Sequence, residues 1–255
     1  MARIPASPYP LGEEIDYTRL LVRTYTEWWN ESMAAIRQDL AMFRDSAWSD
    51  SLFSRISASW LGFTEKATPL VNKIMRRVAD RNFIRFSKQV EAATDKRVIL
   101  ELNPFYSEPW LDLFMSERVS ENIRHIKDIG TQSANRLHTI LDDGIRTGKS
   151  TKAIAQQLRE QFDYGKNRAK LIARDQIGKH NGLLNELRQK NAGVDEYIWS
   201  TSKDERVRST HRVREGETFK WSEPPSDGHP GQPIQCRCVA LPVFPENIFE
   251  TLVKQ

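Results

Sequence analysis

The sequence predicts a mainly α-helical protein with a small α+β C-terminal domain, in which long amphipathic helices precede a short-stranded, loop-rich β tip. Three observations predict this fold class. Apolar residues recur at steps of three and four along most of the chain before Asn191, which is the spacing of helices with one buried face. After Gly193 the pattern changes to the alternation of short strands. A Pro- and Gly-rich loop then leads to both cysteines of the chain.

The helical spacing is interrupted at several places, and each uninterrupted stretch predicts one helix. The predicted helices are residues 16–43, 49–60, 68–94, 119–143, 152–162 and 166–190. Residues 98–102 form a short apolar, β-branched run that fits a strand or a buried connector. The adjacent Trp28 and Trp29 cannot both lie on one apolar stripe. They are therefore either helix packing contacts or an anchor for a partner protein.

The segment Asp143-Gly-Ile-Arg-Thr-Gly-Lys-Ser150 looks like part of a phosphate-binding loop, but its spacing excludes that motif. Its first glycine is one residue too close to Gly148, and no apolar strand precedes it. We instead expect Gly148 to end one helix and Ser150 or Thr151 to cap the next.

The C-terminal third carries the predicted strands. Alternating apolar and aromatic residues indicate strands at 194–200, 217–221 and 238–243. Together with the helices, they divide the chain into regions. These are an extended arm (1–15) with three prolines, a helical N-terminal region (16–110), a second region (111–245) and a C-terminal tail (246–255). The second region comprises a helical lead-in (111–193) and a β-rich tip (194–245).

Composition narrows the class of function. The formal net charge is +4 and the isoelectric point is near 9.0, which suits work beside nucleic acid but lacks the concentrated basic stripe of a dedicated DNA-binding protein. The first ten residues hold no apolar core of a secretory signal, and no apolar run approaches the ~20 residues of a membrane span. We therefore expect a soluble protein made in the cytoplasm, with no membrane partner.

The spacing Cys236-Arg-Cys238 favours metal chemistry over a disulfide framework. In an extended strand, residues two apart point the same way, so the two thiols would share one face. His211 and His229, on loops that fold back, would complete a Cys₂His₂ set for Zn²⁺, with Asp204 as a substitute ligand. The alternative is a pair of reduced, partly buried thiols with His211 held by hydrogen bonds.

A second polar cluster lies in Asp204-Glu-Arg-Val-Arg-Ser-Thr-His211. On one strand face, Asp204, Arg206 and Arg208 would form an ion-pair network that fixes a loop with little apolar content. Arg237 and Trp199 are further predicted members of this structural network. The same residues with His211 would also suit acid–base chemistry. We favour the structural network and predict no catalytic residue, because no nucleophile is accompanied by a positioned base.

A row of arginines on the helix 68–94 is the third candidate feature. Arg76, Arg77, Arg81 and Arg85 recur at helical spacing. Such a row is either a solvated face or a contact for nucleic acid or an acidic partner.

The ordered motifs of the tip resemble a known family. They run aromatic-W-S-T-x-x-D-x-R-V-R-x-x-H, then G-x-x-F-x-W, then H-P-G-x-P-x-x-C-R-C-x-x-x-P. The preceding T-G-K-S and R-A-K-L-I-A-R-D-Q-I-G-K-H-N-G look like the same family's helical lead-in. Over roughly residues 119–242 the chain resembles the phage Mu F-like minor head proteins, also called phage head morphogenesis proteins. The family's recurring residues fall on Trp199, Asp204, Arg206, Arg208, His211, Gly216, Phe219, Pro230, Cys236, Arg237, Cys238 and Pro242.

The resemblance implies that region 111–245 is a Mu F-like head morphogenesis domain of a structural virion protein rather than an enzyme. Its expected partners are the portal protein, other capsid or head proteins and, through non-specific contact, packaged double-stranded DNA. Its expected location is the capsid interior or the portal vertex, after assembly in the host cytoplasm. Its expected role is in head morphogenesis, DNA packaging or DNA ejection.

Two other functions stay open from the residues alone. One is an enzyme, such as a nuclease or a toxin-like domain, that uses Asp204, Arg206, Arg208 and His211. The other is a metal-stabilised DNA-binding protein that contacts DNA through the arginine row on the helix 68–94.

Overall fold

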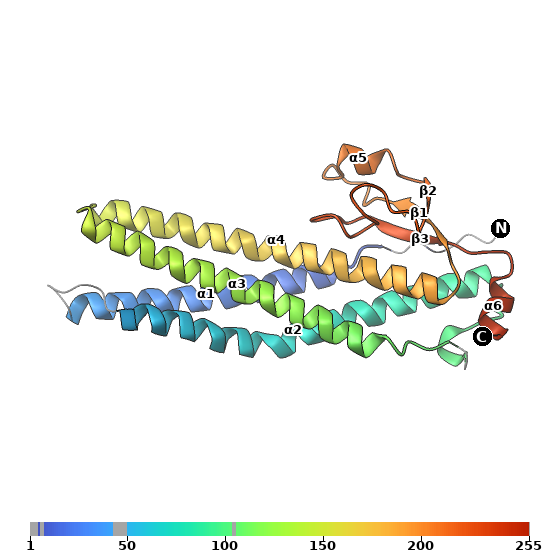
Figure 1. The fold of residues 1–255 in the computed structure, drawn as a ribbon, viewed down its shortest axis with the longest axis horizontal. Coiled ribbons are helices and arrows are strands. Elements are labelled where there is room, and N and C mark those ends of the chain that lie inside the picture. Colours follow the sequence, from blue (N-terminus) through green and yellow to red (C-terminus); the bar gives the residue numbers. More distant parts are fainter. Residues whose placement is uncertain (1–4, 6–7, 43–49, 104–105, 255) are drawn as a thin grey trace. The chain divides into compact units, whose positions relative to one another are not determined.

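The computed structural model describes residue 5 and residues 8–42, 50–103 and 106–254. Figure 1 shows the order of the elements, and 69% of the described residues are helical. The four long helices are α1 (Leu11–Met42), α2 (Asp50–Ala93), α3 (Leu111–Arg146) and α4 (Thr151–Asn191), with the short 3-10 helix η1 (Leu100–Leu102) after α2. The remaining elements are β1 (Glu196–Ser200), α5 (Ser209–Arg212), β2 (Thr218–Lys220), β3 (Val239–Val243) and α6 (Ile248–Lys254). The predicted fold class is confirmed.

The helices are fewer and longer than the sequence pattern predicts. The stretches 49–60 and 68–94 belong to one helix, α2, which continues through Pro69, and the stretches 152–162 and 166–190 both belong to α4. A proline removes one backbone hydrogen bond and costs roughly 3 kcal/mol in a helix interior. Packing along the sides of a 44-residue helix outweighs that local cost.

Other predicted boundaries also move. The first helix begins at Leu11, so the expected arm 1–15 overlaps its first turn, and residues 1–4 and 6–7 lie outside the described part. The run 98–102 is not a strand, because it contains η1, and the buried Val98 and Leu100 fit the alternative of a buried connector. The turn after α3 has the predicted form. Gly148 has a φ of +65°, and the Ser150 hydroxyl accepts the backbone N–H of Ala153, as a helix cap does.

The chain folds into two compact units. One comprises residues 1–14, 74–116 and 174–255, and the other comprises residues 15–73 and 117–173. The predicted regions 16–110 and 111–245 each contribute to both units. We call the first the tip unit, because it contains the three strands, and the second the helical unit.

An aromatic cluster forms the core of the helical unit. Trp28 and Trp29 are both buried, so both are packing contacts, and the rings of Tyr25, Trp60 and Phe162 surround them. Two of the indoles donate to backbone carbonyls: Trp28 Nε1 to that of Ile56 and Trp60 Nε1 to that of Ile126, both at 3.1 Å. Two adjacent tryptophans of α1 can both be buried because aromatic neighbours enclose both faces of the helix there.

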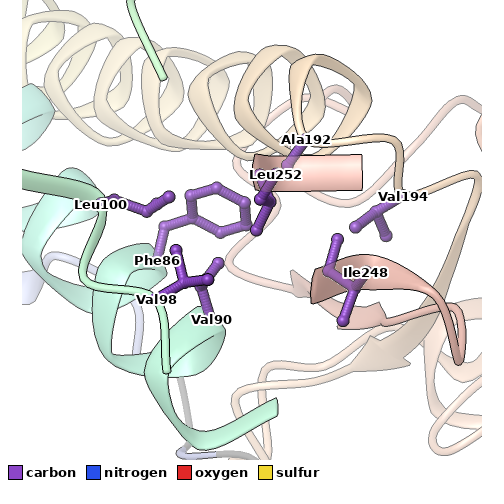
Figure 2. Close-up of a cluster of buried hydrophobic side chains, with 8 residues drawn as sticks. All are labelled: Phe86, Val90, Val98, Leu100, Ala192, Val194, Ile248 and Leu252. Atoms are coloured by element: carbon purple, nitrogen blue, oxygen red, sulfur yellow. The ribbon is translucent and has the colours of Figure 1, made fainter. Parts of the chain in front are cut away.

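The tip unit has an apolar cluster built from segments far apart in the sequence. Figure 2 shows side chains of α2, η1, the end of α4 and α6 meeting in this cluster. Its buried members are Phe86, Val90, Val98, Leu100, Ala192, Val194, Ile248 and Leu252. The predicted tail 246–255 is therefore part of the core, since Ile248 and Leu252 of α6 are almost fully buried.

A buried arginine joins three segments of the tip unit. Arg188 of α4 is 1% exposed and donates to both carboxylate oxygens of Glu108, at 2.6 and 2.9 Å. It also donates to the Ala79 carbonyl and to Asn82 Oδ1 of α2, each at 2.8 Å. A buried guanidinium is tolerated only when its donors are paired in this way.

The sheet is antiparallel, with the strand order β2-β1-β3. Tyr197 of the central strand lies opposite Phe219 of β2 and Pro242 of β3. Gln189 of α4 attaches this sheet to the helix, because its side chain donates to the Ala240 carbonyl and accepts the indole N–H of Trp221, both at 3.1 Å.

The loop that precedes the cysteines packs directly on the backbone of α4. A Cβ atom at Gly178 would lie 2.6 Å from the Cys236 carbonyl oxygen, and one at Gly182 would lie 2.5 Å from the Pro230 carbonyl oxygen. Gly231 in the loop has a φ of +92°, and a Cβ there would lie 2.7 Å from the Gly178 carbonyl oxygen. Three glycines thus allow two backbones to touch where any side chain would hold them apart.

The described helices show no stretch both long enough and apolar enough to span a membrane.

Replacing Gly178 with alanine tests this backbone contact. We expect Gly178→Ala to lower the free energy of unfolding by about 1–3 kcal/mol, because the new methyl group forces the loop away from α4. Gly62→Ala is the matched control, since Gly62 lies in α2 with nothing within 4 Å of its would-be Cβ, and it should gain up to about 1 kcal/mol of helix propensity. Urea unfolding of both variants measures the difference, and equal stability of the two would contradict the contact.

Candidate functional site

The site is built from the segment of the tip unit that runs from β1 to β3 in the sequence. Its base is a cluster of buried side chains with Phe219 packed against them: Tyr197, Trp199, Trp221, Cys236, Cys238 and Ala240. Tyr197 and Trp199 alternate along β1 with more exposed neighbours, as the strand pattern predicts. Figure 1 shows the three strands and α5 grouped together after α4.

The structure brings His211, Cys236 and Cys238 together. One ligand atom from each lies within 4.8 Å of the other two, and all three residues are buried. His211 Nδ1 is 3.6 Å from Cys236 Sγ and 3.5 Å from Cys238 Sγ. Both cysteines are free thiols. They precede β3 instead of lying in it, so the expected strand geometry is wrong, although both sulfurs still face the same imidazole.

The opposite edge of the His211 ring is held by a carboxylate. His211 Nε2 lies 3.0 Å from Asp227 Oδ2, and Arg214 donates to Asp227 Oδ1 at 2.6 Å. A carboxylate only accepts hydrogen bonds, so Nε2 carries the proton. In the neutral ring, Nδ1 therefore presents its lone pair to the two sulfurs.

The same contacts shift the pKa values of these groups. The hydrogen bond from Cys238 lowers the pKa of the Cys236 thiol to about 6, while that bond and burial raise the pKa of Cys238. Partial burial raises the pKa of the Asp227 carboxyl, but hydrogen bonds from Arg214 and His211 outweigh it and leave the pKa lowered. The cluster therefore favours one thiolate beside one thiol.

His229 is placed elsewhere. Its Nδ1 is hydrogen-bonded to the Tyr197 hydroxyl at 2.8 Å, and its ring packs on Trp221 with centroids 4.8 Å apart. Burial lowers the pKa of His229, which keeps the imidazole neutral. The predicted fourth ligand thus has a structural partner of its own and does not join the group of His211, Cys236 and Cys238.

The predicted ion-pair network is only partly assembled as expected. Asp204 Oδ2 accepts Arg237 Nη2 at 2.7 Å and, more weakly, Arg206 Nη2 at 3.5 Å. Arg208 donates instead to the Ile234 carbonyl. Residues 201–208 form turns rather than a strand, so the prediction that Asp204, Arg206 and Arg208 share a strand face is wrong.

Trp199 braces the cluster from the sheet side. It is fully buried, its ring meets His211 edge-on with centroids 5.2 Å apart, and the Arg214 guanidinium lies 4.9 Å from its centroid. Of the residues in the enzyme hypothesis, His211 is paired with Asp227, while Asp204 accepts Arg237. These contacts hold the loops of the tip together, and the enzyme hypothesis stays a prediction.

A pocket of about 280 Å³ opens beside the cysteines. All three members of the Cys–His group line it, together with Arg174, Arg206, Arg208 and Arg237. Three of these arginines face only two carboxylates, since Arg237 and Arg206 are paired with Asp204 and Arg174 with Glu14. The remaining positive charge makes the pocket suited to a small anion.

The arginine row of α2 is largely engaged within the tip unit. Arg76 pairs with Asp112 at 3.5 Å, Arg81 pairs with Glu13 at 2.7 Å, and Arg85 donates to the Pro8 carbonyl at 2.6 Å. Arg77 also takes part in an interaction. Contact of this row with DNA stays a prediction that would require these partners to be shared.

Several site residues escaped the sequence analysis. Asp227 and Arg214 orient His211, and Arg174 lines the pocket from α4. Asp227 lies in the Pro/Gly-rich loop, sixteen residues from His211. Its proximity to the histidine follows from the loop fold and leaves no periodic signal.

Fold and site together define a class: a mainly helical protein with a small tip braced by polar and Cys–His contacts. Comparison with known proteins gives the particular family. The family described as Phage Mu protein F like protein matches residues 120–241, which include α4, β1, β2, the start of β3 and the whole Cys–His cluster. This segment therefore resembles the Mu F-like phage head morphogenesis family, a family of structural virion-associated proteins.

Two relatives are similar over longer or shorter stretches. An uncharacterized protein of Haemophilus influenzae is 31% identical over 194 residues, which are 75% of this chain and 42% of that protein. An uncharacterized protein of Methanocaldococcus jannaschii is 34% identical over 105 residues, 41% of this chain and 16% of that protein. The chain therefore spans less than half the length of these relatives. No solved structure matches it.

Removing the Asp204 carboxylate tests the network. We expect Asp204→Ala to lower the free energy of unfolding by about 1–2 kcal/mol, because Arg237, whose side chain is 10% exposed, loses its charged acceptor. Glu205→Ala is the control, since the neighbouring carboxylate is exposed, and it should change stability by less than about 0.5 kcal/mol. If urea unfolding shows no difference between the two variants, Asp204 does not hold the loop.

Proposed function

We propose that the protein is a minor head protein of a tailed bacteriophage that binds the portal protein at the capsid interior or portal vertex. Its role is in head morphogenesis, DNA packaging or ejection. The observation that carries the proposal is the family match over residues 120–241, because that segment contains both the end of the helical body and the complete tip.

The contacts of the tip support a structural role. Its acidic side chains are used to fix loops: Asp204 receives Arg237, Asp227 receives Arg214, and Glu215 accepts the backbone N–H of Thr201. A segment of few apolar residues keeps one conformation only if such polar contacts hold it. A rigid tip suits a surface that must fit a symmetric partner.

The exposed residues of the tip suit a protein partner. Val213 is 77% exposed and Ile234 is 66% exposed. Arg208 connects their two segments, because it donates to the Ile234 carbonyl and its own carbonyl accepts the N–H of Arg212. Exposed apolar residues among arginines are typical of binding surfaces. We name Val213, Ile234, Arg206, Arg208 and Arg212 the tip surface and propose that it faces an acidic part of the portal protein.

Co-purification with the portal protein of the same phage tests this function. We expect the chain to co-elute with the portal, and the double variant Val213→Asp, Ile234→Asp to weaken binding at least about tenfold. Leu61→Asp is the control, because Leu61 is 49% exposed but lies on α2 in the helical unit. If the double variant binds the portal as tightly as the parent protein, the tip surface is not the contact.

A particle assay tests the location separately. Mass spectrometry of purified virions should detect the chain in low copy number relative to the major capsid protein. Particles that assemble and eject DNA without containing the chain would rule out a virion role.

A further inference from the structure

The Cys–His cluster has the dimensions of a zinc site. A tetrahedral Zn²⁺ with Zn–S bonds of about 2.3 Å and Zn–N bonds of about 2.05 Å separates nitrogen and sulfur ligands by about 3.6 Å. The two distances from His211 Nδ1 to the sulfurs are 3.6 and 3.5 Å. One lone pair on Nδ1 can accept one good hydrogen bond, yet it faces two sulfurs equally. A metal ion between the three atoms satisfies all of them.

The surroundings of the cluster match those of metal-bound histidines. A ligating imidazole almost always donates its other N–H to a carboxylate or carbonyl, which fixes the tautomer. His211 Nε2 donates in this way to Asp227, 3.0 Å away, and Arg214 in turn donates to Asp227. The Cys238 backbone N–H points to Cys236 Sγ at 3.4 Å, and donation to sulfur stabilises a thiolate.

Contacts with α4 fix the backbone around the two thiols. Gly178 of α4 touches the Cys236 carbonyl, so the loop cannot shift toward the helix. Gln235 adopts a φ of +57°, and its backbone N–H donates to Asp175 of α4 at 3.0 Å. This turn directs Cys236 toward His211.

We propose that the tip binds one Zn²⁺ through Cys236 Sγ, Cys238 Sγ and His211 Nδ1, with a solvent molecule or small anion from the arginine-lined pocket as the fourth ligand. Two soft thiolates and one imidazole are a donor set that selects zinc among the common divalent ions. The pocket is lined by all three ligand residues, so its contents have access to them.

The fourth ligand predicted from the sequence is not available. His229 Nδ1 is bound to the Tyr197 hydroxyl at 2.8 Å, and Asp204 is held by Arg237 at 2.7 Å. Three protein ligands leave a tetrahedral ion one open position. Four arginines line the pocket beside it, and they favour an anion or a polarised water there.

Metal analysis tests the proposal directly. Protein purified without chelator or affinity metal should contain about one equivalent of zinc by elemental analysis. Cys236→Ser and Cys238→Ser should each lose nearly all of it. His229→Gln is the matched control: it changes a buried histidine of the same tip and should keep about one equivalent. Zinc loss in His229→Gln with retention in the cysteine variants would overturn the ligand set.

The Asp227 carboxylate, which holds His211, provides a graded readout. Competition with a chromogenic chelator should show that Asp227→Asn binds zinc about 10- to 100-fold more weakly than the parent protein. Glu223→Gln, on an exposed position of the same tip, should bind zinc as the parent does. Equal weakening by both changes would mean that Asp227 does not orient a ligand.

A measurement on the unaltered chain covers the case in which the cysteine variants do not fold. Exchange with Co²⁺ should produce thiolate-to-cobalt charge-transfer absorption in the near ultraviolet and the visible bands of a tetrahedral ion. Chelation should lower the melting temperature by about 5 °C or more and expose two reactive thiols. No cobalt spectrum, together with a melting temperature that ignores chelator, would reject the site in favour of a hydrogen-bonded thiol pair.

Discussion

The backbone contact between α4 and the loop 230–236 is the constraint on which the tip depends. Gly178 and Gly182 lie one turn apart on α4, and Gly231 meets them from the loop. Because no side chain intervenes, the loop is fixed at the shortest distance that backbone atoms allow. Cys236 and Cys238, at the end of this loop, are therefore held close together and face His211 instead of solvent.

Burial then determines what the chemistry at this place can be. His211 is 2% exposed and both cysteines are 4% exposed, so each polar atom must find a partner inside the fold. Asp227 satisfies one edge of the imidazole and the sulfurs face the other. The arginines around the adjacent pocket are balanced in part by Asp204 and Glu14. The same contacts that stabilise the tip thus hold two sulfurs and one imidazole nitrogen close together beside a small pocket. A structural role in a virion and a bound metal are compatible, because both depend on the tip keeping one shape.

Much of the fold could be predicted from the sequence, and the misses have physical causes. The steps of three and four residues identified the helical stretches, but packing set their ends and joined them into four long helices. Pro69 did not stop α2, since long-range contacts outweigh one lost hydrogen bond. Trp28 and Trp29 are both buried because aromatic neighbours enclose α1 on more than one side. In the site, His211, Cys236 and Cys238 could be predicted as a group from residue type and spacing, whereas the role of His229 could not.

The sequence by itself determined the fold class, the position of the tip and the residues from which a metal site would be built, because periodicity and residue chemistry are local properties. Only the tertiary structure decided which of those residues meet. Asp227, Arg214 and Arg174 reach the cluster from separate segments, and His229 is taken by Tyr197. Such pairings depend on how the loops of the tip pack on the helix backbone. Loops are fixed by contacts between residues far apart in the sequence, and no local sequence pattern indicates these contacts.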